Sequence, residues 1–421
     1  MKVLVIGNGA REHTLVWKIA RSRLVDSIYA VPGNAGTGNL ASNLDIPLND
    51  IPAIVGKARE LGIGLAVVGP EAPLAAGISD LFNQASIPVF GPSRAAARLE
   101  SSKAFARDIM QRNNVPCARG KTFTSYSEAE RYIRTQDMPI VVKADGLAAG
   151  KGVTVAKTLD EALSALNSIM KERAFGAAGD TVVVEECLIG KEVSLLAFSD
   201  GINVIPMVPA CDYKRVCDDD RGPNTGGMGS YSPPGFFDQE MTAQVLKNVI
   251  RPTVAAMAKE GAPYKGVLYT GLIMTQQGPR VLEFNARFGD PETQVILPRL
   301  KSDLVEIMLA VLEGGLDHAK IEWSGDACVG VVMASGGYPG SYRTDLPISI
   351  SDKLDKDINI FYAGATERAG GKIVTSGGRV LTVTATGRSM KEAREKVYHN
   401  IPYINFEGCH FRRDIAAREV N

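Results

Sequence analysis

The sequence predicts an α/β fold built from several compact units, and three observations lead to this prediction. The chain has 421 residues, which is enough for two to four domains. Its first hundred residues alternate between short apolar runs and amphipathic stretches, as alternating strands and helices do. Several apolar runs end in glycine-rich loops, and in open α/β sheets such loops form the ligand crevice.

The composition narrows the class of protein. The chain is 45% hydrophobic and 22% charged, and its 47 Lys and Arg residues balance 47 Asp and Glu residues. We therefore expect no nucleic-acid or membrane partner. The scattered cysteines and histidines predict neither disulfides nor a zinc site. The start, MKVLVIGNGA, enters a strand directly, and no apolar run approaches about 18 residues, so we expect a cytoplasmic protein without a membrane span.

Residues 1–102 are predicted to form a Rossmann-like unit. Strands are expected at residues 2–6, 27–31 and 65–68, with a helix at residues 11–23. The turn GNGARE begins like a dinucleotide-binding fingerprint, but Glu12 replaces the third glycine. The second strand ends in Pro32-Gly33-Asn34, where an acid for ribose hydroxyls is expected. A turn and a helix N-terminus still suit one phosphate, so a sugar phosphate fits better than a dinucleotide.

Two charged residues at this sheet edge have open interpretations. Arg11 either adds positive charge to the phosphate site or lies in solvent beside a tight turn. Glu71, in the loop GPEAP, either faces the same site or caps a helix.

The stretch VVKADGLAAGKGV, residues 141–153, places a glycine-rich loop between two predicted strands. It differs from a P-loop because Gly146 and Gly150 enclose three residues, and Gly152 follows Lys151 where a hydroxyl is expected. The residues after it favour a strand over a helix. The loop is either a lid that closes over phosphates or a glycine-rich hairpin with a solvated lysine.

The stretch RVLEFNARFGDPETQ, residues 280–294, predicts a metal site. Side chains alternate between the two faces of a strand. The expected apolar face carries Leu282, Phe284, Ala286 and Phe288, and the expected polar face carries Glu283, Asn285 and Arg287. A carboxylate and a carboxamide at this spacing suit Mg²⁺, and an arginine beside them can neutralise phosphate. Asp290-Pro291 is expected to begin a helix. The alternative is a half-exposed strand with a surface ion pair.

Two further stretches contribute candidate ligand contacts. In VVVEECLIGKEVS, residues 182–194, a buried strand leads into acids and a glycine turn, which suits an inter-domain crossing that binds adenine and ribose, or a charged hairpin. In CDYKRVCDDDRGPNTGGMGSY, residues 211–231, the three consecutive aspartates favour a solvated turn. The TGGMG run there predicts a backbone that can approach a ligand closely.

Together these segments resemble the phosphoribosylamine–glycine ligase family of the ATP-grasp superfamily. The resemblance runs nearly end to end, and RFGDPETQ is its most specific part. It rests on VLVIGNGARE, PGNAGT, VGPEAPL, SKAF, VVKADGLAAGKGV, GPNTGGMGSYSP, EFNARFGDPETQ and GGYPG. It implies an ATP-grasp fold with a Rossmann-like first domain (1–102), an ATP-grasp domain (103–325) with a mobile lid (about 121–190) and a strand-rich C-terminal domain (326–421).

The resemblance also implies a reaction and a site. ATP would drive the joining of glycine to 5-phosphoribosylamine through glycyl phosphate, in de novo purine synthesis, by a monomeric enzyme. ATP contacts would be Lys103, Lys143, Gly146, Gly150, Lys151, Gly152, Glu185, Leu188 and Glu192. Phosphoribosylamine contacts would be Gly9, Arg11, Glu12, Gly33, Asn34, Gly36, Thr37 and Glu71. Mg²⁺ or Mn²⁺ would bind Glu283 and Asn285, and the catalytic residues would be Arg287, Lys143, Asp212 and Lys214.

The sequence departs from the family pattern at three places, and two alternatives stay open. The strand GLIMT lacks an acid that is common in the superfamily, so the number of metal ions is undetermined. Tyr213 stands where relatives often have histidine, and Ser101-Ser102-Lys103 replaces Gly-Ser-Lys. The alternatives are a related ATP-grasp ligase with a different acid or acceptor, and a non-catalytic nucleotide sensor.

Overall fold

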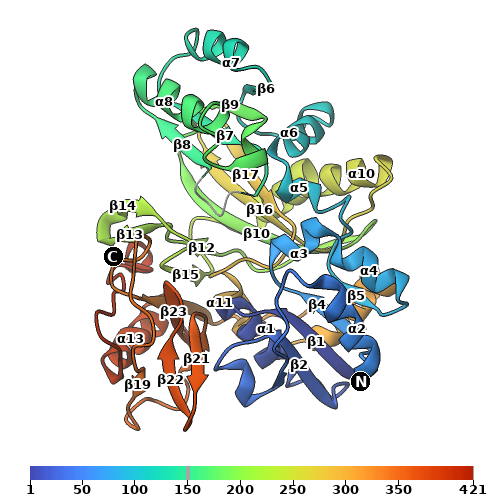
Figure 1. Ribbon diagram of the computed structural model, residues 1–421, viewed down its shortest axis with the longest axis vertical. Coiled ribbons are helices and arrows are strands. Elements are labelled where there is room, and N and C mark those ends of the chain that lie inside the picture. Colours follow the sequence, from blue (N-terminus) through green and yellow to red (C-terminus); the bar gives the residue numbers. More distant parts are fainter. Residues whose placement is uncertain (148–151, 421) are drawn as a thin grey trace.

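The structure is a computed structural model that describes residues 1–147 and 152–420. These residues form four sheets of four or five strands and three two-stranded ribbons (Figure 1). Within the described ranges, no helix is both long enough and apolar enough to cross a membrane.

The N-terminal sheet is parallel, with the strand order β3-β2-β1-β4-β5. Its strands are β1 (Lys2–Gly7), β2 (Ser27–Pro32), β3 (Ser42–Asn43), β4 (Leu65–Val68) and β5 (Val89–Phe90). Its helices are α1 (Ala10–Ile19), α2 (Ile51–Leu61), α3 (Glu71–Ala76) and α4 (Ile78–Gln84). This order matches the first five strands of the Rossmann order 3-2-1-4-5-6, so the unit is Rossmann-like, as predicted. Helix α1 ends four residues before the predicted end, because the Ser22 N–H turns back to the carbonyl of Ile19.

A small sheet of order β6-β9-β7-β8 stands at the top of Figure 1, and α7 and α8 cover one of its faces. Helices α5 (Arg98–Ser101) and α6 (Lys103–Arg112) lead into it. Its elements are β6 (Gly120–Phe123), α7 (Tyr126–Ile133), β7 (Ile140–Ala144), β8 (Val153–Ala156), α8 (Leu159–Met170) and β9 (Val182–Glu186). The glycine-rich stretch lies between the antiparallel strands β7 and β8, which confirms the predicted strand–loop–strand arrangement.

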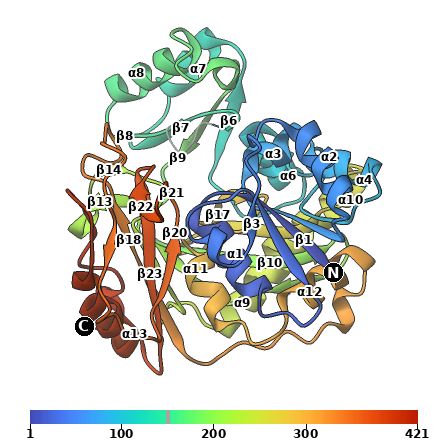
Figure 2. The ribbon, with the colours of Figure 1, turned by 60° about the horizontal axis from the view of Figure 1, so that its bottom comes forward.

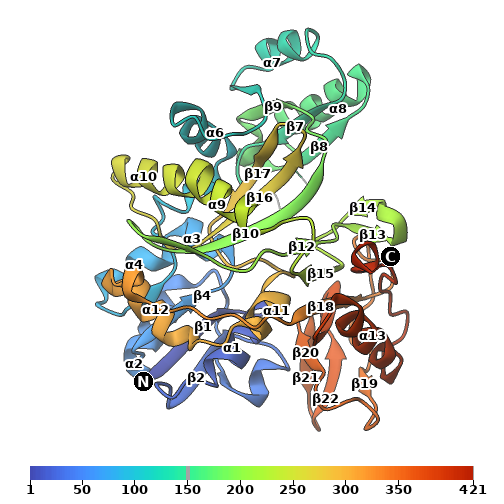
Figure 3. The ribbon, with the colours of Figure 1, turned by 180° about the vertical axis from the view of Figure 1, so that it is seen from behind.

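The central sheet, of order β11-β10-β16-β17, has helices on both faces (Figure 3). Its strands are β10 (Lys191–Asp200), β11 (Val204–Pro206), β16 (Lys265–Thr275) and β17 (Gly278–Asn285). Val193 and Leu195 of β10 face α9 (Gln239–Val245), a π-helical turn (Leu246–Ile250) and α10 (Arg251–Lys259). Leu196 and Phe198 face α12 (Leu304–Glu313) and the N-terminal sheet. The alternation of a strand thus places two apolar cores on the two faces of one sheet.

The C-terminal sheet has the order β12-β15-β18-β23-β20, with α13 (Met390–Asn400) packed against β18 and β23. Its strands are β12 (Cys211–Asp212), β15 (Gly229–Ser232), β18 (Ala327–Ala334), β20 (Asn359–Tyr362) and β23 (Arg379–Gly387). The ribbons pair β13 (Arg215–Cys217) with β14 (Arg221–Asn224), β19 (Ser349–Ile350) with β24 (Ile404–Asn405), and β21 (Ala365–Arg368) with β22 (Lys372–Thr375). Residues 211–232 therefore complete a sheet whose other strands come from the last hundred residues.

The N-terminal and C-terminal segments lie side by side, below the small sheet (Figure 2). His13 of α1 forms part of this contact. Its Nδ1 accepts a hydrogen bond from the Tyr362 N–H at 2.9 Å, and its ring stacks on Tyr362 at 5.9 Å between centroids. Burial lowers the pKa of His13 to about 4.

This contact predicts a pH-dependent stability. Because the folded pKa of His13 lies below its ordinary value of 6.5, the native state binds fewer protons, and stability falls as the pH drops from 6.5 towards 4. Because of His13, the free energy of unfolding should fall by about 2 kcal/mol when the pH is lowered from 7.5 to 5. In His13→Asn, whose Oδ1 can accept the same hydrogen bond, this loss should be absent from urea unfolding curves. An unchanged loss would contradict the assignment, and the solvent-exposed His318→Asn is the matched control.

Candidate active site

The predicted metal-binding residues lie on the open face of β17. Glu283 is exposed and Asn285 is half-buried, whereas Phe284, Ala286 and Phe288 are buried, so the predicted alternation is confirmed there. Leu282 departs from it, because a β-bulge opposite Gly271 and Leu272 shifts the register by one residue. Val281 takes the buried position and Leu282 is half-buried instead.

Glu283 lies within a group of cationic side chains. Partial burial in the surrounding protein acts to raise its pKa, but Lys214, Lys143, Lys103 and Arg287 together lower it below the ordinary value. Glu283 is open to solvent and forms no ion pair of its own with the residues that the structure describes, whereas Lys143, Lys214 and Arg287 each also pair with other carboxylates. Such a site suits a polyphosphate, with a divalent ion at its carboxylate.

The small sheet contributes Lys143 to this group. Its Nζ lies 2.6 Å from Glu185 Oε2 and donates to the carbonyl of Leu282 at 3.3 Å. Arg107 Nη1 holds the other oxygen of Glu185, also at 2.6 Å. Glu185 thus orients the lysine towards β17. Sequence reasoning missed Arg107, although it lies four residues after Lys103 on the same helix, a spacing that places both on one face.

The glycine-rich stretch docks on the N-terminus of α6. Lys103 Nζ donates to the carbonyl of Gly146 at 2.9 Å, and Asp145 accepts from the Ala104 N–H at 3.0 Å. Gly146 has a φ of +99°, which favours glycine. The carbonyl of Gly152 accepts from the Ala144 N–H at 2.8 Å. The predicted contacts Gly150 and Lys151 lie outside the described residues.

Asp212 and Lys214 flank the same region. Burial raises the pKa of Asp212 to about 7, and the carboxylates of Glu292, Glu192 and Glu283 add to this while Lys214 opposes it. Burial acts to lower the pKa of Lys214, but Asp212, Glu192 and Glu283 raise it overall. Lys214 Nζ forms an ion pair with Glu192. A lysine among three carboxylates remains charged at neutral pH.

The residue between them, Tyr213, points the other way, towards the C-terminal segment. Its hydroxyl accepts from the Ala416 N–H at 3.0 Å, and the Arg412 guanidinium lies 4.6 Å from its ring centre. The aspartates at 218–220 were expected to form a solvated turn, and this is only partly correct. Asp220 pairs with Arg412, and Asp218 accepts from the Arg413 N–H. The sequence could not show these partners, which lie almost two hundred residues away.

Leu188 lies on the connector between β9 and β10. It lines a cavity of about 560 Å³ together with Glu186, Cys187 and Arg280. The cluster around Glu283 is not part of this cavity, because Glu185 points towards Lys143 whereas Glu186 points towards Arg119 and Arg280. The cluster around Glu283, and not this cavity, is therefore the candidate active site, because it contains the cationic side chains and the predicted metal ligands.

Arg287 connects β17 to the N-terminal segment. Its Nε donates to Glu71 Oε2 at 3.2 Å, and its Nη2 lies 3.0 Å from Glu100 Oε1. Burial acts to lower the pKa of Arg287, but Glu100 and Glu71 raise it. Glu71, whose role the sequence left open, therefore both begins α3 and faces Arg287. Glu100 also accepts from the Ala286 N–H at 2.7 Å, and sequence reasoning missed it.

The first turn of α1 is organised by Glu12. Its buried carboxylate accepts from the Gly9 N–H at 2.6 Å and pairs with Arg11 Nε at 2.5 Å. A Cβ at Gly7 or Gly69 would lie 2.4 Å or 2.0 Å from the Glu12 side chain, so the two glycines make room for it. Arg11 also donates to the carbonyl of Phe288 at 3.2 Å, so the solvent-exposed alternative for Arg11 is wrong.

The loop from Gly33 to Thr37 is held by its own side chains. Asn34 Oδ1 accepts from the N–H groups of Gly36 and Thr37, and Asn34 Nδ2 donates to the carbonyl of Tyr362 at 2.7 Å. Thr37 Oγ1 accepts from the Asn34 N–H at 2.7 Å. Gly33 has a φ of +73°, and a Cβ at Gly36 would overlap His13. These residues shape the loop beside the first turn of α1.

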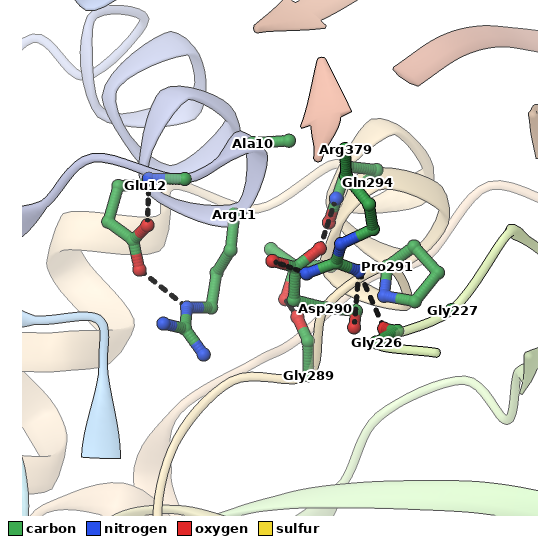
Figure 4. Close-up of polar contacts among 12 residues, drawn as sticks. Ala10, Arg11, Glu12, Gly226, Gly227, Gly289, Asp290, Pro291, Gln294 and Arg379 are labelled. Carbon is green, nitrogen blue, oxygen red and sulfur yellow. Dashed lines mark hydrogen bonds and ion pairs between the residues drawn. The ribbon is translucent and has the colours of Figure 1, made fainter. Parts of the chain in front are cut away.

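The turn after β17 differs from its prediction. Asp290-Pro291 does not begin a helix, since α11 spans Thr293–Ile296 with Glu292 as its N-cap residue. The Asp290 carboxylate accepts instead from Gln294 and Arg379 (Figure 4). The TGGMG run approaches other parts of the protein closely. A Cβ at Gly227 would lie 2.4 Å from Pro291 Cδ, and one at Gly226 would lie 3.1 Å from Arg379 Cζ.

Comparisons with known proteins agree with this geometry. Models of the phosphoribosylglycinamide synthetase N domain, ATP-grasp (A) domain and C domain match residues 1–100, 101–293 and 328–418. Phosphoribosylamine–glycine ligases of Caldanaerobacter subterraneus and Vibrio cholerae are each 49% identical to this chain. The first match covers 99% of this chain and all of the relative, and the second covers 100% and 99%.

Solved structures of the same family and of a related fold also match nearly the whole chain. The phosphoribosylamine–glycine ligase of Thermotoga maritima has a TM-score of 0.87 and 34% identity, covering 99% of this chain and 100% of that one. The biotin carboxylase of Campylobacter jejuni has a TM-score of 0.75 over 97% of this chain and 92% of that one. Its identity of 16% shows a shared fold alone.

Proposed function

This chain belongs to the phosphoribosylamine–glycine ligase family of ATP-grasp enzymes, and we propose that it joins glycine to 5-phosphoribosylamine in purine biosynthesis, at the expense of ATP. The observation that carries the proposal is the position of Glu283. It lies on a strand that faces the small sheet, among Lys103, Lys143, Lys214 and Arg287.

The donor set fits a divalent ion. Glu283 and Asn285 offer a carboxylate and a carboxamide oxygen on one face of β17, and Mg²⁺ or Mn²⁺ takes such oxygens together with nucleotide phosphates and water. When bound there, the ion would neutralise charge on the transferred phosphoryl group. Asn285 Oδ1 lies 3.4 Å from Arg287 Nη2, so the amide oxygen already faces the cationic side.

The ATP phosphates would lie between β17 and the small sheet. Lys103 and Lys143 supply charge, and Gly146, Gly150, Lys151 and Gly152 would supply a lid that excludes water. Leu188 lies on the connector into β10 and Glu192 lies at the start of β10 itself, and adenine and ribose would bind there. Glu185 would then hold Lys143 in place, which is the contact that the structure records.

The reaction requires activation of glycine, because its carboxylate has no leaving group. A carboxylate oxygen of glycine would attack the γ-phosphorus, ADP would leave, and glycyl phosphate would form. The amine of phosphoribosylamine would then attack the acyl carbon, lose a proton and release phosphate. Fixed cations such as Arg287 stabilise the charge that develops in both steps, and Lys214 beside Asp212 would orient glycine.

The acceptor would bind at the edge of the N-terminal sheet. The first turn of α1, which begins after Gly9 and includes Arg11 and Glu12, presents N–H groups without helical partners, which suits a phosphate, while the Gly9 N–H itself donates to Glu12. The loop with Gly33, Asn34, Gly36 and Thr37 lies beside it, and Glu71 reaches the same region through Arg287. We further propose a cytoplasmic monomer that acts on small molecules alone.

The test is ADP release with purified enzyme, Mg²⁺ and freshly made phosphoribosylamine. ADP should accumulate only when ATP, glycine and phosphoribosylamine are all present, and glycinamide ribonucleotide should appear in equal amount. A preference for another amino acid or acceptor in a panel would instead support a different ATP-grasp ligase. Tight NAD binding without ADP release would support a nucleotide sensor.

A further inference from the structure

Arg379, the first residue of β23, connects two loops from other parts of the chain (Figure 4). Its Nη2 donates to Asp290 Oδ2 at 2.8 Å, and its Nη1 donates to the carbonyls of Gly226 at 2.6 Å and Asp290 at 3.2 Å. The side chains of Arg379 and Asp290 are 21% and 15% exposed. The Arg379 guanidinium therefore fixes one carboxylate and two main-chain oxygens, while the side chains of Arg379 and Asp290 stay partly exposed to solvent.

The two loops fit closely around this guanidinium. Gly227 has a φ of +109° and lies against Pro291, and the Gly226 N–H donates to the Tyr338 hydroxyl at 3.0 Å. Gln294 Nε2 donates to the second oxygen of Asp290 at 2.8 Å. Gln294 and Arg379 thus each donate to one oxygen of the Asp290 carboxylate, and Arg379 comes from the C-terminal sheet.

The oxygen that Arg379 holds faces the first turn of α1. A Cβ built on Gly9 would lie 3.6 Å from Asp290 Oδ2. Burial acts to raise the pKa of Asp290, but Arg379 and Arg11 lower it, so the carboxylate is charged at neutral pH. A fixed, ionised carboxylate at this turn is a strong acceptor for hydroxyl groups.

We propose that Arg379 is a positioning residue for phosphoribosylamine: it holds Asp290 beside Gly9, where the carboxylate accepts hydrogen bonds from the ribose hydroxyls of the acceptor. This inference rests on the proposed function and adds the C-terminal sheet to the acceptor site. The acceptor's phosphate would bind the N–H groups on the side of this turn away from Asp290, because two anions repel each other. Arg11, which is held by Glu12 and the Phe288 carbonyl, adds positive charge to the turn.

The test compares Arg379→Gln with wild type in steady-state kinetics. Arg379→Gln should raise the KM for phosphoribosylamine about 30-fold, since a charge-assisted contact is lost, and leave the KM values for ATP and glycine near wild type. Arg379→Lys should recover part of the affinity, because it keeps the charge but not the two-pronged geometry. Arg368→Gln is the matched control, since Arg368 pairs with Asp345 on an exposed ribbon of the same region.

A double-mutant cycle separates positioning from general stability. If Arg379 acts through Asp290, the effects of Arg379→Gln and Asp290→Asn on the KM for phosphoribosylamine should be strongly non-additive. Additive effects, an unchanged acceptor KM, or an equal rise of all three KM values with a lowered Tm would each overturn the inference. A wild-type enzyme without acceptor-dependent ADP release would instead defeat the proposed function itself.

Discussion

Glu283→Gln is expected to lower turnover by at least about 10²-fold while the protein stays folded. The substitution keeps the shape of the side chain but removes the carboxylate whose pKa Lys214, Lys143, Lys103 and Arg287 lower. A divalent ion would lose its charged ligand and keep only Asn285. Turnover is measured by ADP release at saturating substrates, and folding by thermal unfolding.

A second readout separates metal binding from other effects of the charge. Titration of Mn²⁺ into the enzyme with ADP, followed by electron paramagnetic resonance, should show weaker binding in Glu283→Gln than in wild type. The exposed Glu367→Gln, on the ribbon strand β21, is the matched control and should change neither quantity. Near-normal turnover with normal Mn²⁺ binding in Glu283→Gln would count against the metal assignment.

Arg287→Met is expected to have the largest combined effect on stability and activity. The guanidinium is 17% exposed and pairs with Glu71 and Glu100, of which Glu100 is 7% exposed. Removing it leaves a buried carboxylate without its partner, which should cost about 3 kcal/mol of unfolding free energy. Turnover should fall by about 10²-fold, because a cation at the phosphoryl site is lost. Urea unfolding and ADP release measure the two effects.

The two roles of Arg287 can be separated with a second substitution. In Arg287→Met with Glu100→Gln, no unpaired charge remains at position 100, so most of the lost stability should return while turnover stays low. Recovery of turnover along with stability would show that Arg287 acts only as a structural partner. Arg112→Met is the matched control, since Arg112 also pairs with two carboxylates but lies in solvent, where ion pairs contribute little.

Local patterns predicted much of the fold and part of the site. The side-chain alternation of β17 placed Glu283, Asn285 and Arg287 on one face, and the glycine-rich stretch was correctly placed between two strands. The α/β character of the first unit followed from its alternating apolar runs, and the family resemblance added that it is Rossmann-like. These features depend on neighbours within a few residues, which is the distance over which periodicity carries information.

The errors have a different origin, because they depend on pairings that periodicity does not encode. The bulge at Leu282 arises from the register of the hairpin with β16, and Asp290 is drawn to the remote Arg379 rather than to a helix start. The residues that orient the site, Arg107 and Glu100, look ordinary in the sequence because charged residues are common on helices. Only the folded chain shows that each is buried against a carboxylate or a cation of the site.

The most direct test of the account is a crystal structure of the enzyme with Mn²⁺ and a non-hydrolysable ATP analogue. We expect an anomalous scattering peak at bonding distance, about 2.1 Å, from oxygens of Glu283 and Asn285, with the β- and γ-phosphates between Lys103 and Lys143. A nucleotide bound elsewhere, or a Mn²⁺ peak remote from β17, would contradict it.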